Sequence, residues 1–322
     1  NCSIALATVS PPDRHGYVSL GTNADYTASF IGDIPFFLEV NPNMPHTDGQ
    51  NQLHLGQAVG WCSSEEALPD VPSAEPDERD HTIAGFVAER IPDGACLQVG
   101  VGRIPNALLA ALTGHRDLGL HTEALSEGVM DLIESGALTG TRKRQARNKH
   151  VATFCVGTRR LYDWLDHNGS VSMMPAAWVN NFLTVAAEPG LVAINATSEV
   201  DLMGQPASET KGGRYWSGTG GQADFSAGAM YSEGGESFLV LHSTTHDGTS
   251  RINLGLTPGS VVTAHKNTVD NVVTEYGIAE LRGRTVSERA RRLIGIAHPD
   301  HRERLWREAR EGGVLHEKRV LA

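Results

Sequence analysis

The sequence is poor in lysine and in long apolar runs. Of its 27 basic residues only five are Lys, and 38 acidic residues bring the net charge to −11. A surface with this charge repels polyphosphates, which disfavours a nucleic-acid-binding protein. No apolar run reaches the roughly 18 residues that a membrane-spanning helix needs. Charged residues at positions 13–15 also interrupt the opening segment, which argues against a signal peptide. We therefore expect neither nucleic acid nor a membrane as a partner.

Cysteines are few and scattered, at positions 2, 62, 96 and 155, without CxxC spacing. This distribution argues against a zinc site or a disulfide framework and fits a reducing cytoplasm. A G-x-S-x-G nucleophile elbow, an H-E-x-x-H zinc helix and a phosphate-binding P-loop are missing as well. His298 and His301 could share a helix face with Asp300 or Glu303 as a metal site. Because no third ligand is evident, we interpret this segment as a helix start and expect no metal.

The order of apolar runs and helical patterns predicts an α/β protein with a mostly parallel sheet. Residues 64–80 are acidic and Pro-rich, which is typical of a linker, although an ordinary solvated loop would have a similar composition. We therefore divide the chain into 1–63, a linker at 64–80, and 81–322. Strands are expected at Ile4–Val9, Phe36–Val40, Cys96–Val101, Leu118–Thr122, Val151–Val156, Leu191–Ala196, Phe238–Leu241, Ser260–Thr263 and Val272–Thr274, and helices at Thr82–Ile91, Asn106–Leu112, Val129–Ser135 and Val286–Ile296.

Three segments could carry chemistry. In residues 98–107 a strand leads through glycines into a helix, an arrangement that aims free backbone N–H groups at an anion. Pro105 occupies the third glycine position of a dinucleotide fingerprint, so that function is excluded. Glu123 follows a predicted strand, at the sheet edge where α/β proteins bind ligands, although a lone Glu there is more often a solvated loop residue. Residues 217–225 (SGTGGQADF) hold three glycines in four residues, which lets the backbone lie against a ligand.

Together these segments resemble the acetyl-CoA hydrolase/transferase family, which includes 4-hydroxybutyrate CoA-transferase. Its SPPDxHGYxSLG signature is matched by residues 10–21, and the same order of motifs then follows over nearly the whole chain. The matching segments are NPNMP at 41–45, GVGRIP at 100–105, HTE at 121–123, GTRRLYD at 157–163, EVDLMGQ at 199–205, SGTGGQADF at 217–225, VVTEYGIAELRG at 272–283 and IAHPDHR at 296–302.

The resemblance implies a class I CoA-transferase of two similar open α/β domains with the active site between them. A glutamate would attack the acyl-CoA thioester, the CoA thiolate would return to form a glutamyl-CoA thioester, and an incoming short-chain carboxylate would accept the CoA. Acyl-CoA and CoA are then substrates, and no cofactor is bound permanently. Two alternatives remain open: an acyl-CoA hydrolase in which water intercepts the same thioester, and a non-catalytic CoA-binding subunit.

By the same resemblance Glu123 is the nucleophile, and the backbone N–H groups of Val101 and Gly221 form the oxyanion hole. Asn180 matches the asparagine that holds the glutamyl carbonyl, with Phe182 where proline is usual. Glu199 is another conspicuous acid, which we interpret as structural or peripheral because relatives tolerate a non-acidic residue there. The loops that approach the ligand contribute Gly100, Gly102, Gly218, Gly220 and Gln222.

Family members carry about a hundred or more residues before the SPPD motif, whereas this sequence has nine before Ser10. We therefore expect an incomplete N-terminal domain. We also expect either a homo-oligomer or a complex with a chain that supplies the missing segment, and activity that depends on that segment. The acyl group and the acceptor are not specified by the sequence.

Overall fold

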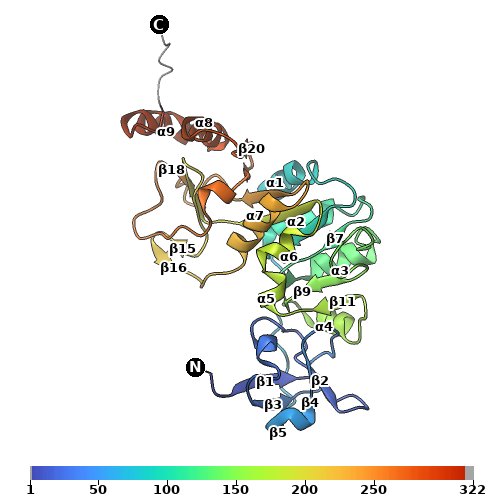
Figure 1. The fold of residues 1–322 in the computed structure, drawn as a ribbon. Helices are drawn as coiled ribbons and strands as arrows, with labels where there is room; N and C mark the ends of the chain where they lie inside the picture. Colours follow the sequence, from blue (N-terminus) through green and yellow to red (C-terminus); the bar gives the residue numbers. More distant parts are fainter. Residues whose placement is uncertain (1, 316–322) are drawn as a thin grey trace.

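The computed structural model describes residues 2–315, and a six-stranded sheet forms its centre (Figure 1). The strand order is β20-β19-β17-β12-β6-β7, and every neighbouring pair is parallel except β19 with β20. A mostly parallel sheet flanked by helices confirms the predicted α/β class. The strands are β6 (Cys96–Val99), β7 (Gly119–Leu120), β12 (Leu191–Ala196), β17 (Glu236–Val240), β19 (Asn271–Thr274) and β20 (Gly277–Glu280).

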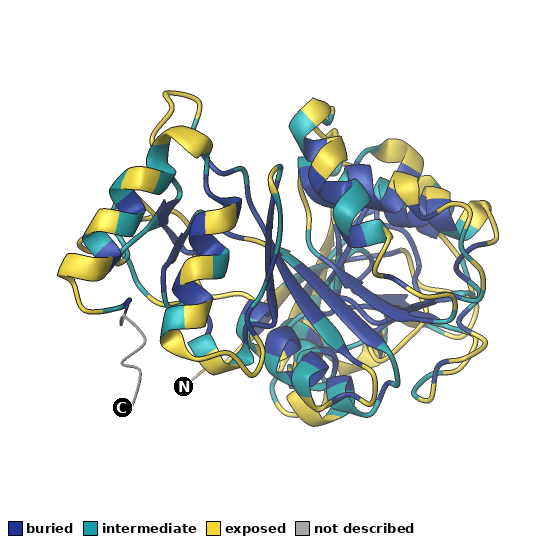
Figure 2. Ribbon diagram, turned by 90° about the horizontal axis from the view of Figure 1, so that it is seen from above, coloured by how far each residue is buried: buried dark blue, intermediate teal, exposed yellow. Residues whose placement is uncertain are grey.

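Different helices cover the two faces of this sheet, because successive side chains of a strand point to opposite sides. In β12, Val192 and Ile194 share a core with α1 and α2, whereas Leu191 and Ala193 pack with residues of α6 and α7. Helix α8 packs on β20, and α9 packs on α8. Figure 2 shows the buried strands between helices whose outer faces are exposed. The helices are α1 (Glu78–Ala88), α2 (Arg103–Ala111), α3 (Glu127–Glu134), α4 (Arg159–Leu165), α5 (Ala176–Val179), α6 (Phe182–Ala186), α7 (Gln222–Tyr231), α8 (Val286–Ile296) and α9 (Pro299–Glu311).

Residues 2–63 form a smaller region at one end of the molecule, drawn in blue in Figure 1. Strands β1 (Ala5–Val9), β3 (Phe36–Val40) and β5 (Ala58–Ser63) make a parallel sheet, and β2 (Tyr17–Ser19) pairs with β4 (Gln52–His54). Buried residues of this region, including Val9 and Leu38, belong to the same hydrophobic cluster as α1 and α2. Residues 64–77 form neither helix nor strand and lie against the folded parts, since the Val71 N–H donates to the Gly157 carbonyl at 2.9 Å.

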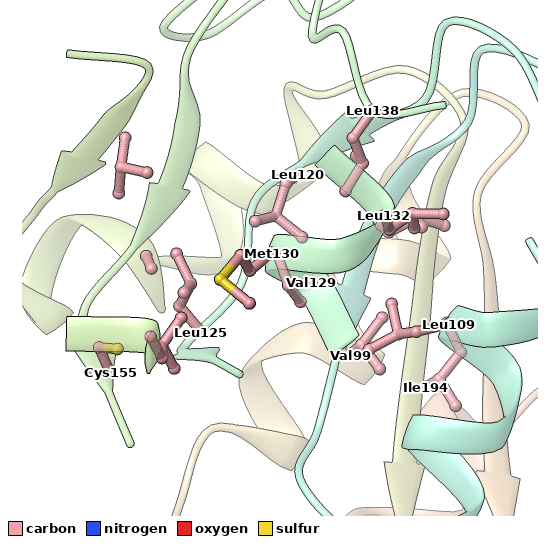
Figure 3. Packing of buried hydrophobic residues seen from close by; sticks show 14 of the residues in the cluster. Val99, Leu109, Leu120, Leu125, Val129, Met130, Leu132, Leu138, Cys155 and Ile194 are labelled. Carbon is pink, nitrogen blue, oxygen red and sulfur yellow. The ribbon is translucent and has the colours of Figure 1, made fainter. Parts of the chain in front are cut away.

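Short strands and α3 support the segment that follows β7. Strand β8 (Ala124–Leu125) pairs with β10 (Phe154–Cys155), and β9 (His150–Ala152) pairs with β11 (Val171–Met173). Figure 3 shows Val129 and Met130 of α3 beside Leu120 and Leu125, all four of them buried. The end of β7 is thus held by packing on both sides of Glu123. The remaining elements of the described residues are β13 (Glu199–Asp201), β14 (Pro206–Ala207), β15 (Thr210–Lys211), β16 (Arg214–Tyr215), β18 (Ile252–Asn253) and the short 3₁₀ helices η1 (Thr27–Phe30), η2 (Leu55–Gln57) and η3 (Lys266–Thr268).

The predicted elements agree with the structure at most positions, and one strand is wrong. Ser260–Thr263 is irregular, because its polar groups bond elsewhere: the Ser260 hydroxyl donates to Glu199 at 2.6 Å. Val151–Val156 is divided between β9 and β10, and α1 begins four residues before the predicted Thr82. Within residues 2–315, no helix is long and apolar enough to cross a membrane.

Candidate active site

Glu123 lies at the carboxyl end of the central sheet, half-buried between β7 and β8. Its backbone carbonyl accepts the N–H groups of Thr153 and Phe154, both at 3.0 Å. One residue earlier, the Thr122 hydroxyl donates to the Val99 carbonyl of β6 at 3.0 Å. These bonds fix the main chain on each side of the glutamate, so its side chain starts from a defined position.

The Glu123 carboxylate is held by two donors that sequence analysis places in the site. The Gly221 N–H donates to Oε2 at 3.0 Å, and the Asn180 side-chain amide donates a second hydrogen bond. Gly221 precedes α7 and offers no side-chain cap, so the free N–H groups and the positive end of the helix dipole face the carboxylate. A Cβ on Gly221 would come within 2.4 Å of Glu123 Oε2 and 2.6 Å of Asn180 Nδ2, so only glycine fits.

The electrostatic surroundings of Glu123 include two further acids. Burial raises the pKa of its carboxyl, and the negative charges of Asp25 and Asp224 act in the same direction, while the hydrogen bonds from Gly221 and Asn180 oppose them. A carboxylate of higher pKa is a stronger nucleophile once it is ionised. Asp25 comes from the N-terminal region, and sequence reasoning missed it. Its positive φ of 38° is uncommon for a non-glycine residue and is the one local sign of a constrained position.

The Val101 loop follows β6 at the same edge of the sheet. Val101 is 51% exposed, and no hydrogen bond within residues 2–315 uses its N–H. Gly102 has a φ of 132°, a conformation that favours glycine, and α2 begins at the next residue. Gly100 donates its N–H to the Ile194 carbonyl of β12 at 3.0 Å, which ties the loop to the sheet. The loop therefore presents an available backbone donor.

A cleft of about 690 Å³ adjoins Val101 and Ser217, at the start of the second glycine loop. Its walls carry two cations, unusual in so acidic a chain. The Lys211 ammonium lies 3.7 Å from the centre of the Trp216 ring. Arg251 has a pKa lowered by burial and by the neighbouring Arg79, and its Nε has no partner among the described residues. Such a cleft has the size and the placed positive charge to hold an elongated anionic ligand.

The glycine loop itself is exposed, and its end is buried. Cβ atoms on Gly218 and Gly220 would meet nothing within 4 Å, so these two positions leave space beside the loop. Gln222 is 8% exposed, and its Nε2 lacks a partner within residues 2–315, as does Asn180 Oδ1. Two buried polar atoms beside Gly221 therefore have no hydrogen-bond partner among the described residues, which is uncommon for buried groups.

Glu199 lines the same cleft, but its carboxylate is fully used by the protein. It is 7% exposed and accepts from the Thr257 hydroxyl at 2.7 Å and the Ser260 hydroxyl at 2.6 Å. The Thr257 N–H donates to it as well, at 3.2 Å. These contacts fix the loop at residues 257–260, which supports a structural role.

Two of the histidines are buried near the base of the site. The Nε2 of His121 lies 2.8 Å from the Val179 carbonyl, so Nε2 carries the proton in the neutral ring. This hydrogen bond holds Val179, the residue before Asn180, in position. Burial lowers the pKa of His121 to about 4, and burial lowers that of His150 to about 4. Both rings are therefore neutral in the folded protein at neutral pH.

These two histidines should make the protein sensitive to acid. In the unfolded chain each histidine binds a proton near pH 6.5, whereas in the folded protein it does so only near pH 4. Unfolding therefore takes up protons in this window, and stability falls as the pH drops from 6.5 to 4, by on the order of 3 kcal/mol for each ring. Urea unfolding at a series of pH values measures the slope. His150→Phe should flatten it, and an unchanged slope would contradict this assignment.

The predicted helix start at residues 298–302 is confirmed. His298 caps α9, its ring accepting the Asp300 N–H, and Pro299 is the first helical residue. The ring of His301 bonds instead to the Gly248 carbonyl at 2.8 Å. Each of the two rings therefore has its own hydrogen-bond partner.

Comparison with known proteins identifies the family. The profile of the acetyl-CoA hydrolase/transferase C-terminal domain matches residues 157–309. Succinyl-CoA:cyclohexane-1-carboxylate CoA transferase of Geobacter metallireducens is 44% identical over 311 residues, which are 95% of this chain and 71% of that protein. 4-Hydroxybutyrate coenzyme A transferase of Clostridium kluyveri is 40% identical, with 95% and 72% covered. The crystal structure of RipA from Yersinia pestis superposes with a TM-score of 0.93 at 36% identity, with 97% and 71% covered.

The chain belongs to the acetyl-CoA hydrolase/transferase family. The two named relatives are both CoA-transferases, which agrees with the enzyme class that the sequence predicts. Hydrolases of the family are more distant: acetyl-CoA hydrolase of Candida albicans is 28% identical, with 92% of this chain and 61% of that protein covered.

Proposed function

We propose that this chain moves CoA from an acyl-CoA to a short-chain carboxylate, with Glu123 as the covalent nucleophile. The observation that carries the proposal is the position of the Glu123 carboxylate, held by Gly221 and Asn180 at the open end of α7. A carboxylate that is fixed in place and partly desolvated suits nucleophilic attack on a thioester.

The reaction transfers CoA twice, first from the donor acyl group to the Glu123 carboxyl and then from Glu123 to the acceptor. Glu123 attacks the thioester carbonyl, the C–S bond breaks, and CoA thiolate leaves behind an acyl-glutamyl anhydride. The thiolate attacks the glutamyl carbonyl and releases the donor carboxylate, which leaves a glutamyl-CoA thioester. The acceptor carboxylate attacks that thioester, the C–S bond breaks, and a second anhydride forms between the acceptor and Glu123. The freed thiolate attacks the acceptor's carbonyl in this anhydride, which forms the new acyl-CoA and releases the Glu123 carboxylate. No oxidant, metal or resident cofactor is needed, since CoA enters and leaves as substrate.

Each tetrahedral intermediate carries an oxyanion, for which we assign the N–H groups of Val101 and Gly221 as donors. Both come from glycine-containing loops that precede helices, so the helix dipoles add to the stabilisation. Lys211 and Arg251 of the adjoining cleft supply positive charge for the phosphates of CoA. Remote binding of this kind supplies the energy that a weak carboxylate nucleophile lacks.

Trapping the intermediate tests the mechanism. Protein incubated with acetyl-CoA and no acceptor, then treated with borohydride, should carry a hydroxymethyl group in place of the Glu123 carboxyl. Cleavage after Arg116 and Arg142 isolates this residue on a peptide without cysteine, so tandem mass spectrometry can place the change. Modification found at a cysteine or serine instead would refute the glutamyl route.

The hydrolase alternative uses the same thioester with water as the acceptor. We favour transfer, because the more similar of the compared relatives are CoA-transferases. Measuring free CoA and the CoA thioester of the acceptor, with and without a short-chain carboxylate, separates the two activities: a hydrolase releases free CoA without an acceptor, whereas a transferase turns over only with the acceptor and converts it to its CoA thioester. A cytoplasmic setting and assembly with further chains are also part of the proposal; the four free thiols at positions 2, 62, 96 and 155 support the former.

A further inference from the structure

The first residue of α2 carries a charge that the helix itself disfavours. Arg103 directly follows the Val101 loop and Gly102, and a cation at a helix N-terminus meets the positive end of the dipole. The turn has no side-chain cap of its own either, since Gly102 occupies the N-cap position. Something outside α2 must therefore determine where this turn lies.

The Arg103 guanidinium leaves α2 and binds the start of α1. Its Nη2 lies 2.5 Å from Asp77 Oδ2 and 2.7 Å from Asp80 Oδ2. Those two acids also form a capping box at the N-terminus of α1. The Asp77 side chain accepts the N–H groups of Arg79 and Asp80, and the Asp80 side chain accepts the Asp77 N–H at 2.8 Å. Arg103 thus binds the first turn of α1, which its own hydrogen bonds hold in place.

The first turn of α1 also contacts the central sheet. Asp80 is 1% exposed, and its Oδ1 lies 2.7 Å from Nε2 of His242, which follows β17 at the same sheet edge as Val101 and Glu123. Asp77, Asp80 and His242 have the spacing of metal ligands, but Arg103 holds the carboxylate oxygens and supplies the positive charge. The cluster is therefore an ion-pair network, in which the Nη2 of Arg103 binds both carboxylates while its Nε has no hydrogen-bond partner among the described residues.

We propose that Arg103, held by Asp77 and Asp80, is a positioning residue that sets the direction of the Val101 N–H toward the thioester oxygen. The inference rests on the proposed function, because it assumes the oxyanion role of Val101. Only Gly102 separates Val101 from Arg103, and it has no side chain to hold the loop. The Gly100 N–H bond to Ile194 fixes the loop before Val101, and the ion pair of Arg103 limits its movement after Val101. Loss of the pair leaves substrate binding largely intact and misaligns the donor during the reaction.

The test compares Arg103→Met with Arg159→Met. Arg159 is likewise the first residue of a helix, α4, and pairs with Asp163 at 2.6 Å, so the control removes the same charge from the same helix position. Arg103→Met should lower kcat about 10- to 100-fold and change KM for acetyl-CoA by less than about threefold. Arg159→Met should leave both near the parent values. Arg103→Lys should restore part of kcat, because one of the two ion pairs can form again.

Asp77→Asn supplies an independent variant that keeps α1 capped, since Asn is as good an N-cap as Asp. If Asp77 acts through Arg103, the double variant should be little worse than Arg103→Met alone, whereas independent effects would multiply. Circular dichroism and thermal unfolding establish that each variant folds. Equal loss of kcat in Arg103→Met and Arg159→Met would overturn the proposal.

A spectroscopic readout separates positioning from general destabilisation. In a Glu123→Gln background, the carbonyl stretch of bound ¹³C-acetyl-CoA should move to lower frequency than in water, because the oxyanion donors polarise it. Adding Arg103→Met should move the band back toward the free value; an unchanged band would contradict the inference. Should Glu123→Gln itself remain active, the proposed function fails whatever Arg103 does. If Glu123→Gln is inactive and Arg103→Met changes neither kcat nor the carbonyl band, the proposed function stands and only the positioning role of Arg103 fails.

Discussion

Replacing Glu123 by Gln should lower turnover by roughly three to six orders of magnitude, as expected when a covalent nucleophile is removed. Gln keeps an oxygen that can accept the Gly221 N–H, so the hydrogen bond at 3.0 Å and the surrounding fold are retained. The loss therefore reports on chemistry and not on unfolding. Steady-state transfer of CoA from acetyl-CoA to a short-chain carboxylate, measured beside thermal unfolding, provides the comparison.

Glu199→Gln is the matched control for this experiment. Glu199 is a second acid on the adjoining cleft. Gln keeps one oxygen that accepts from the hydroxyl of Thr257 or Ser260, and its NH2 group can donate to the other hydroxyl. We expect turnover within about tenfold of the parent, with some loss of stability, since hydrogen bonds to a charged acceptor are stronger than those to a neutral one. A dead Glu199 variant beside an active Glu123 variant would reverse the assignment of the nucleophile.

Gly221→Ala should also lower turnover, by less than Glu123→Gln and for a steric reason. The backbone there has φ −79° and ψ 0°, which alanine adopts without backbone strain, so any effect comes from the contacts of the added methyl group. Its methyl group, however, would lie 2.4 Å from Glu123 Oε2 and 2.6 Å from Asn180 Nδ2, and both side chains must move. A displacement of this size at a nucleophile costs about a hundredfold in kcat.

Gly114→Ala makes the same chemical change where a Cβ meets nothing within 4 Å. Its kinetics should match those of the parent. A Gly221→Ala protein with full kcat would show that Glu123 does not need its present position, and the geometric argument for its role would be lost. Measuring kcat and KM separately matters here, because a misplaced nucleophile lowers kcat, while a blocked cleft would raise KM.

The parts of the site that sequence predicts are those with a local pattern. Glu123 ends an apolar run, which marks the end of a strand, and the glycines around Val101 and Gly221 mark turns before helices. Their roles came from resemblance to a family, because a strand-end glutamate alone has no distinctive spacing. The apolar residues of Ser260–Thr263 predicted a strand wrongly, since side-chain hydrogen bonds to Glu199 replace the strand ladder there.

The parts that sequence could not predict depend on contacts between distant segments. Asp25 lies near Glu123 in space but 98 positions earlier in the chain, and neither residue's neighbours encode that contact. The pairing of Arg103 with Asp77 joins the starts of two helices, and only the cation at a helix N-terminus hinted at a partner elsewhere. Lys211 and Arg251 meet at one cleft because of loop paths that no periodicity describes.

The same long-range contacts determine when the nucleophile becomes functional during folding. The carbonyl of Thr153, whose own N–H bonds to the Glu123 carbonyl, accepts the N–H groups of Ala24 and Asp25 from the N-terminal region. A parallel sheet and pairings this far apart in sequence form slowly, because the entropy cost of closing long loops comes before any stabilising contact is made. The Glu123 carboxylate meets Gly221 and Asn180 only after these closures. A partly folded chain therefore has no organised glutamate to react with acyl-CoA, and covalent modification should begin only once the sheet is complete.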